Sequence, residues 1–114
     1  MAKVYGLHEI ELLPGVDPGE FEQLAAEMAK ALAYEGWTYH LVKGERGERA
    51  GKYMIVMEIE SLEARDRYAP TADGPFSGEV QEWERRNAAI LSKWKSMATM
   101  PGENTVFTDY VVVL

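Results

Sequence analysis

Two stretches of this chain are apolar on both faces of a β-strand, and this property limits the folds that the chain can adopt. In the stretch 52–60, KYMIVMEIE, Met54 and Val56 alternate with the equally apolar Ile55 and Met57. The final stretch, YVVVL, does not alternate at all. A strand that faces water on one side alternates apolar with polar residues, so these strands need cover on both faces. At about 25 cal/mol per Å² of apolar surface, leaving several such side chains in water costs several kcal/mol.

The other segments predict helices and strands in the order β-α-β-β-α-β, with the second helical region divided. Asp17 and Pro18 are typical of a helix start, and Ser61 and Ser77 are typical N-cap residues. Gly36 is the expected stop of the first helix. Alternation indicates strands, and apolar residues at helical spacing indicate helices. The predicted elements are strand 4–13, helix 18–34, strands 37–42 and 52–60, a short helix from Ser61 to Tyr68, a longer helix from Gly78 to about Met97, a turn at Pro101-Gly102, and strand 106–114.

This order is that of a single ferredoxin-like α+β domain over residues 1–114, with a four-stranded antiparallel sheet and both helical regions on one face. The other sheet face is then open, although its strands are apolar. A second copy of the chain is the simplest cover, because two-fold homodimers are the commonest oligomers. The alternative is that helix or tail residues of the same chain cover this face, but little of the sequence is left unassigned.

The stretch 43–54, KGERGERAGKYM, has the glycines and basic residues of a phosphate-binding loop. A phosphate loop leads into a helix N-terminus, whereas this stretch joins two predicted strands. The net charge of −7 also argues against nucleic acid as a partner, since binding to a phosphate backbone depends on Lys and Arg. We therefore interpret the stretch as a hairpin connection in which Gly44, Gly47 and Gly51 supply positive φ angles.

Composition excludes further classes of function. The chain has no cysteine, which excludes disulfides, thiolate metal sites and a cysteine nucleophile. No apolar run approaches the length of a membrane span, and the first residues lack a signal-peptide pattern, so we expect a cytoplasmic protein with no membrane partner. The potential metal ligands His8, His40 and Asp109 lie on separate strands without ligand spacing, and we expect neither a metal nor a cofactor.

His8 is the main candidate for catalysis. It shares a strand parity with Val4 and Ile10, the parity expected to face the helices. A titratable ring on an apolar face can act as a general acid or base. The alternative is a structural histidine that is hydrogen-bonded and partly exposed. The same two interpretations apply to His40.

Aromatic residues are the candidates for ligand binding. A cleft between sheet and helices could take a flat apolar ligand, with phenol and indole N–H groups fixing its orientation. The alternative is core filling, which we favour for Phe21 and Trp94. Arg65 and Arg67 could attract an anionic ligand, but pairing with Glu63 and Asp66 on their own helix is the preferred interpretation. The substrate-binding candidates are Tyr53, Trp83, His40, Tyr68 and Asn87, with Trp37, Tyr39 and Tyr110 as further possible wall residues.

The segments KVYGLHEIELLPGVDPGEFEQL, KYMIVMEIESLEARDRY and TVFTDYVVVL together resemble the dimeric α/β-barrel superfamily. That superfamily includes antibiotic-biosynthesis monooxygenase-like, NIPSNAP-like, EthD-like and stress-responsive barrel proteins. The resemblance implies two sheets packed back to back, with a ligand in each subunit between sheet and helices. Its haem-degrading members use an asparagine, a tryptophan and a helical histidine. Residues 78–98 contain Trp83, Asn87 and Trp94 but no histidine, so the resemblance does not carry haem degradation to this chain.

Two functions are compatible with these observations. One is a cofactor-independent monooxygenase or related enzyme that acts on an aromatic or polyketide-like substrate, with His8 as acid or base and with Tyr53 and Trp83 as walls. The other is a non-enzymatic, ligand-binding or stress-related homodimer. Fold alone does not separate them.

Overall fold

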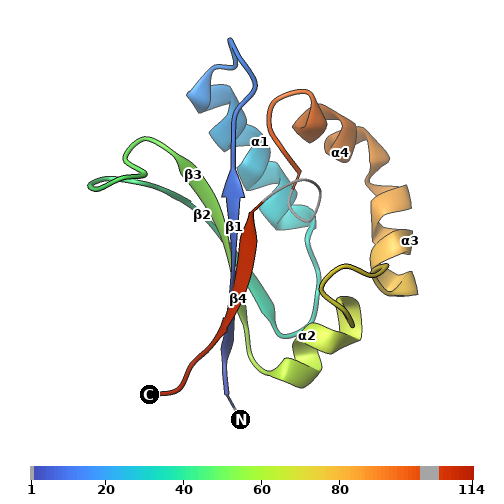
Figure 1. Cartoon of the computed structure of the whole chain (residues 1–114). Coiled ribbons are helices and arrows are strands. Elements are labelled where there is room, and N and C mark those ends of the chain that lie inside the picture. Colours follow the sequence, from blue (N-terminus) through green and yellow to red (C-terminus); the bar gives the residue numbers. More distant parts are fainter. Residues whose placement is uncertain (1, 101–105) are drawn as a thin grey trace.

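The computed structural model describes residues 2–100 and 106–114, and the predicted turn at Pro101-Gly102 lies outside the described residues. The chain folds as an α+β domain with all the predicted strands and helical regions, although their bounds differ and the predicted long helix is divided in two (Figure 1). The elements are β1 (Val4–Ile10), α1 (Pro18–Ala31), β2 (Trp37–Lys43), β3 (Tyr53–Ile59), α2 (Leu62–Tyr68), α3 (Gly78–Arg86), α4 (Ala88–Lys95) and β4 (Phe107–Val111).

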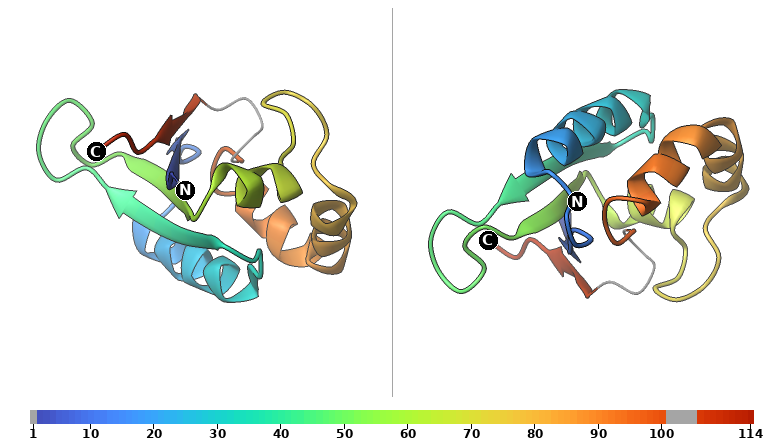
Figure 2. Two further views of the ribbon diagram at one scale, coloured as in Figure 1. Left: turned by 90° about the horizontal axis from the view of Figure 1, so that it is seen from below. Right: turned by 90° about the horizontal axis from the view of Figure 1, so that it is seen from above.

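The four strands form one antiparallel sheet in the order β2-β3-β1-β4, which confirms the ferredoxin-like prediction. The helices lie on one side of the sheet, and the opposite face carries none (Figures 1 and 2). The two ends of the described chain meet at one end of the sheet, where the backbone N–H of Val112 donates to the carbonyl of Lys3 at 2.9 Å. The β1–β4 register places His8 opposite Phe107.

The helix starts follow the predicted capping residues, but α1 is shorter than predicted. The Asp17 carboxylate accepts a hydrogen bond from the Glu20 N–H at 3.1 Å, and Ser61 accepts one from the Ala64 N–H at 3.0 Å. The first helix ends at Ala31 because Leu32 already has extended backbone angles (φ −73°, ψ 129°). Tyr34, predicted to be helical, therefore lies in the connection to β2.

The predicted long helix 78–97 is divided into α3 and α4 at Asn87. The Asn87 side chain donates to the Trp83 carbonyl at 2.9 Å, and its backbone leaves the helical region (φ −111°, ψ 27°). Asparagine side chains compete with the helical backbone in this way. Apolar spacing continues across the break, which is why the sequence pattern predicts one helix.

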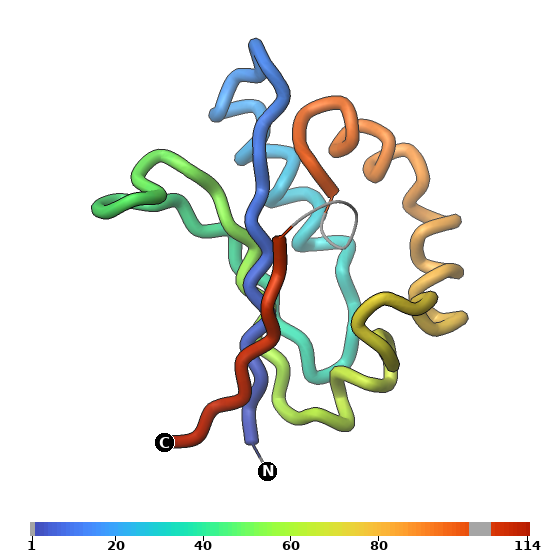
Figure 3. Tube along the Cα trace, in the orientation of Figure 1, coloured from blue at the N-terminus to red at the C-terminus, as the bar shows by residue number. Residues whose placement is uncertain are grey.

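The β2–β3 connection is the predicted hairpin, and it projects away from the helices (Figure 3). Gly47 and Gly51 have positive φ angles of 108° and 81°, as predicted. Gly44 does not have one, so the prediction for this residue is wrong. A Cβ atom at Gly44 would lie 1.9 Å from the Arg49 carbonyl oxygen. Glycine is needed there because two backbone segments approach closely.

The main core lies between the sheet and the helices, where Ile10, Phe21, Ile55 and Trp94 are buried. On the open face, Met54 and Val56 are only half-buried. Tyr110 is 56% exposed and lies opposite Tyr5 on this face. Within residues 2–100 and 106–114, no helix has the length and apolarity needed to cross a bilayer.

Candidate functional site

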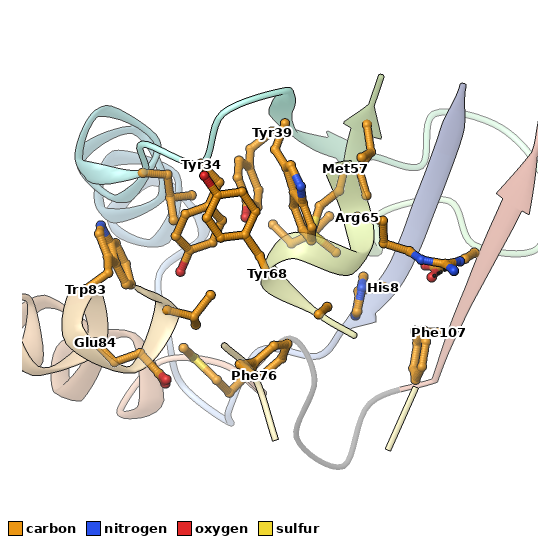
Figure 4. A pocket seen from close by; sticks show the side chains of 18 of the residues that line it. His8, Tyr34, Tyr39, Met57, Arg65, Tyr68, Phe76, Trp83, Glu84 and Phe107 are labelled. Carbon is orange, nitrogen blue, oxygen red and sulfur yellow. Dashed lines mark hydrogen bonds and ion pairs between the residues drawn. The ribbon is translucent and has the colours of Figure 1, made fainter. Parts of the chain in front are cut away.

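A cavity of about 250 Å³ lies between the sheet and the helices, and we call it the sheet–helix pocket (Figure 4). All four strands and all four helices contribute to its lining, together with the loop that joins α2 to α3. It exists because α3 packs against α2 and α4 and makes few contacts with the strands. Its volume is close to the lower end, about 300 Å³, of ordinary small-molecule sites.

One end of the pocket, the histidine end, is formed by His8, Arg65, Phe107 and Asp109. Strand alternation turns His8 toward the helices, as predicted, and its side chain is only 7% exposed. The imidazole stacks on the Phe107 ring, with centroids 5.1 Å apart and planes 8° from parallel. The cross-strand register between β1 and β4 holds this pair in place.

The polar atoms of His8 have no partner in the described part of the chain. Its Nδ1 atom is buried without a hydrogen bond, and the structure gives its Nε2 atom none either. An unsatisfied buried polar group costs about 1–3 kcal/mol. Burial lowers the pKa of His8, and the negative charge of Asp109 only partly opposes this effect. The ring is therefore neutral near pH 7 and keeps a lone pair able to accept a proton.

Asp109 reaches the histidine end because residue 6 is a glycine. A Cβ atom at Gly6 would lie 3.0 Å from Asp109 Oδ1, closer than such contacts normally permit. The other carboxylate oxygen, Oδ2, lies 3.5 Å from Nη1 of Arg65. Arg65 also forms an ion pair with Asp66 at 3.0 Å, as predicted. Two carboxylates therefore hold the one arginine of the pocket lining.

The second arginine of α2 has a different role. Arg67 was predicted to pair within its own helix. It instead contacts Glu35 at 2.9 Å and Glu79 at 3.1 Å, so it joins α2 to α3 and to the α1–β2 connection. Its guanidinium lies over the Tyr68 ring, 5.0 Å from the centroid. Arg67 therefore connects elements that surround the pocket but does not line the pocket itself.

The opposite end of the pocket, the tyrosine end, is formed by Tyr34, Tyr39, Tyr68, Trp83 and Glu84 (Figure 4). Tyr34 is its centre. The Tyr34 ring is stacked on Tyr68 with centroids 4.8 Å apart, and it meets Trp83 edge-on at 6.0 Å. Such offset and edge-to-face pairs are the favoured arrangements of aromatic rings.

Most of the N–H and hydroxyl groups of the aromatic side chains near this end already form hydrogen bonds with the backbone. The indole N–H of Trp83 donates to the Ala31 carbonyl at 2.7 Å, and that of Trp37 donates to the Ala64 carbonyl at 2.8 Å. The Tyr68 hydroxyl accepts from the Glu35 N–H at 3.0 Å. The bond to Ala31 satisfies the last carbonyl of α1, which has no partner within the helix. The expectation that indole N–H groups orient a ligand is therefore wrong for these two tryptophans.

The hydroxyls of Tyr34 and Tyr39 are different, because neither has a hydrogen-bond partner among the described residues. Burial raises the pKa of both phenols, and the Glu84 carboxylate raises that of Tyr34 further. Both groups are therefore neutral at physiological pH. They are available to a ligand as hydrogen-bond donors or acceptors.

The remaining predicted site residues lie elsewhere. Tyr53 lines a separate groove between α1 and the edge strand β2. The Tyr53 hydroxyl donates to the Glu22 carboxylate, and burial together with this bond raises the pKa of Tyr53 to about 12. The His40 Nε2 atom lies 3.9 Å from Glu58 on the open sheet face. Asn87 caps α3. The structure thus brings His8, Tyr68 and Trp83 to the pocket but places Tyr53, His40 and Asn87 outside it.

Among the residues that form the two ends of the pocket, Tyr34, Glu84, Phe107 and Asp109 are not predicted as binding or catalytic residues by the sequence. Tyr34 was assigned to a helix. Glu84 follows the buried Trp83 on α3 and resembles other surface glutamates in the sequence. Phe107 and Asp109 share a strand parity, and an acid on the parity that faces the helices is the sequence signal for this part of the site. Their contacts with His8 and Arg65 depend on the sheet register.

No group of three histidine, aspartate or glutamate side chains that could hold a metal ion occurs within residues 2–100 and 106–114. The pocket lining contains one imidazole, that of His8. A neutral imidazole at this position can accept a proton from a bound molecule.

No family model matches the chain, and no curated protein matches it. Solved structures do. SnoaB, a cofactor-independent oxygenase from Streptomyces nogalater, matches with a TM-score of 0.60 and 13% identity over 100% of this chain and 96% of that chain. A DABB-family protein with a ferredoxin-like fold from Mesorhizobium loti matches with a TM-score of 0.59 and 16% identity, covering 99% of each chain.

A third match is a dimeric protein of unknown function from Bacteroides fragilis, with a TM-score of 0.51 and 12% identity over 95% of this chain and 94% of that chain. These likenesses confirm at the level of the fold the resemblance inferred from the sequence. At such low identities the function must be argued from the site itself.

Proposed function

We propose that the protein binds a flat, mainly apolar small molecule in the sheet–helix pocket and that His8 accepts a proton from it. The observation that carries the proposal is a neutral, buried imidazole without a hydrogen-bond partner at one end of an aromatic-lined cavity. Unsatisfied buried polar groups are rare in folded proteins and call for an explanation. A ligand hydroxyl or an acidic C–H group at this position would supply one.

The reaction that fits best is a cofactor-independent oxygenation of an aromatic or polyketide-like substrate. His8 takes a proton from a methylene group held between two aromatic rings, and the resulting carbanion passes its electrons to molecular oxygen. One oxygen atom becomes the new carbonyl, and the other leaves as water together with both methylene hydrogens. The fold shared with a cofactor-independent oxygenase supports this choice.

The alternative is a binding protein without catalysis. It is favoured by the absence of a second acid or base beside His8, since the nearby Asp109 carboxylate contacts Arg65 and no hydrogen bond joins it to the imidazole in the described structure. Under this alternative the same pocket holds the same class of ligand, and His8 serves only as a hydrogen-bond acceptor.

Oxygen uptake with anthrone, a carbon acid of the required type, tests the enzymatic proposal. We expect uptake by the wild type and a loss of about 10²–10⁴-fold in His8→Ala, the usual contribution of a general base. Thermal shift measurements with the neutral probe naphthylmethanol are made in parallel. Binding without oxygen uptake would leave the non-enzymatic alternative. If no planar aromatic stabilises the wild type, the pocket has been assigned wrongly.

We also propose that two copies associate through the open sheet face. Half-buried Met54 and Val56 and the exposed Tyr110 give this face an apolar surface, and exposed apolar patches of this kind commonly mark interfaces. One protein with this fold is described as dimeric. Sedimentation at micromolar concentration is expected to give twice the chain mass of 12.8 kDa. A monomer mass would contradict this assembly.

A further inference from the structure

The charges around the sheet–helix pocket are not balanced. Its lining contains one arginine, Arg65, and three carboxylates, Asp73, Glu84 and Asp109. Arg65 is already held by Asp109 and by Asp66 outside the lining. Within the described residues, neither Glu84 nor Asp73 has an ion pair or a hydrogen bond. The pocket thus presents negative charge without a cation of its own to offset it.

Glu84 is the more informative of the two carboxylates because of its surroundings. It is half-buried, whereas Asp73 lies on an exposed loop. It is close enough to Tyr34 to raise the pKa of that phenol, in addition to the effect of burial. The aromatic surfaces of Tyr34, Tyr39 and Trp83 line the same end of the pocket (Figure 4). A carboxylate beside several aromatic rings is the combination that attracts an organic cation.

The histidine end provides a second, independent observation that points to a ligand in this pocket. His8 is 7% exposed, lines the same cavity and has a buried nitrogen without a partner. Because burial keeps this imidazole neutral, it adds no positive charge that would repel a cation. Arg65 is the one positive group of the lining, and its two carboxylate partners make it a poor receptor for an anion.

We propose that the pocket prefers a planar aromatic ligand that carries an amine or ammonium group, with the cationic group beside Glu84 and Tyr34 and the uncharged part of the ring system toward His8. This inference rests on the proposed function, because it names the charge class of the molecule bound at the same site. The cation gains from the ring faces of the tyrosine end and from the unpaired carboxylate. An anion of the same shape meets repulsion from Glu84 and Asp73.

The experiment compares three probes of one shape: naphthylmethylammonium, naphthylmethanol and naphthoate. Affinities for the whole chain are measured by isothermal titration calorimetry at neutral pH and low salt, since salt screens charge interactions. We expect the cation to bind about tenfold more tightly than the alcohol, which corresponds to about 1.4 kcal/mol, and the anion to bind most weakly.

Two variants locate the effect. Glu84→Gln should abolish the preference for the cation, so that the cation and the alcohol bind about equally, and circular dichroism checks that the variant is folded. Glu82→Gln removes the same charge from the same helix, but Glu82 pairs with Arg85 and does not line the pocket, so the preference should persist.

The outcomes separate this inference from the proposed function. If the alcohol binds but the cation binds no better, or if both variants lose the preference equally, the cation site is refuted and the pocket stands. If none of the three probes binds, the proposed function itself loses its support.

Discussion

The histidine end and the tyrosine end of the pocket share one cavity but differ in how their polar atoms are satisfied. At the tyrosine end, the polar atoms of Trp83 and Tyr68 are bonded to the backbone of other elements. At the histidine end, His8 has no hydrogen bond among the described residues, and the Asp109 carboxylate lies close against Gly6. The side-chain contacts that hold helices together are therefore concentrated at the tyrosine end, whereas the histidine end contains the buried nitrogen that no described residue satisfies.

The difference has a physical origin in the elements that meet at each end. The Trp83 indole joins α3 to the last carbonyl of α1, and the Tyr68 hydroxyl joins α2 to the α1–β2 connection. These contacts hold three helices in place. The histidine end lies on β1 and β4, whose positions are already set by the backbone ladder. The His8 side chain is therefore not needed to join these elements, and the following substitutions test this contrast.

The largest effect is expected at the tyrosine end, from Trp83→Ala. This change removes a buried indole and leaves the Ala31 carbonyl without its partner, so we expect the free energy of unfolding to fall by about 3–5 kcal/mol. Urea denaturation measures it. Trp83→Phe is the matched control, because it keeps an aromatic ring while losing the N–H group and part of the indole, so we expect a smaller loss of stability. An alanine variant no less stable than the phenylalanine variant would show that this end does not hold the helices.

An intermediate effect is expected at the histidine end, from Gly6→Ala. The new methyl group would displace the Asp109 carboxylate, and overpacking of this kind costs about 1–3 kcal/mol. Gly78→Ala is the control, since a Cβ atom there meets nothing within 4 Å and alanine favours the helix. The urea denaturation midpoints of the two variants are compared, and we expect a lower midpoint for Gly6→Ala. Equal stability of both variants would contradict the close approach of Asp109 to β1.

The smallest effect is expected from His8→Leu and depends on pH. Because burial lowers the pKa of His8 in the folded state, the unfolded chain binds the proton more readily. Wild-type stability should therefore fall as the pH drops below about 6.5, by at most about 1.4 kcal/mol per pH unit for this group. The leucine variant lacks this contribution and should show a flatter profile, with unchanged or higher stability at neutral pH.

Urea denaturation of the wild type and of His8→Leu across this pH range makes the comparison. A loss of several kcal/mol for the variant at neutral pH would mean that His8 is a structural histidine with a partner. That result would also remove the contrast between the two ends of the pocket.

Much of the fold could be predicted because its causes are local. The caps at Asp17, Ser61 and Ser77 depend on a side chain and a backbone N–H three residues later. The break at Asn87 has an equally local cause, but apolar residues continue at helical spacing across it, and this spacing predicts one continuous helix. His8 was predicted to face the helices from strand alternation alone, which the structure confirms.

Most of the pocket could not be predicted, because its geometry depends on contacts between distant parts of the chain. Arg65 and Asp109 are separated by 44 positions, and they meet only because β4 pairs with β1 beside α2. Tyr53 has the sequence features of a wall residue, yet β3 turns it toward Glu22 of α1. Periodicity tells which face of a strand a residue occupies but not which neighbour it meets there.

The sequence by itself determined the order of the elements, the ferredoxin-like sheet and an open face with apolar residues, because hydrophobic alternation and capping act within a few residues. Only the tertiary structure decided that the polar groups of Trp83 and Tyr68 bond to the backbone of neighbouring elements, whereas His8 has no hydrogen-bond partner among the described residues. That outcome depends on packing of α3 against α2 and α4 instead of against the strands, which leaves a cavity where a continuous core would otherwise form.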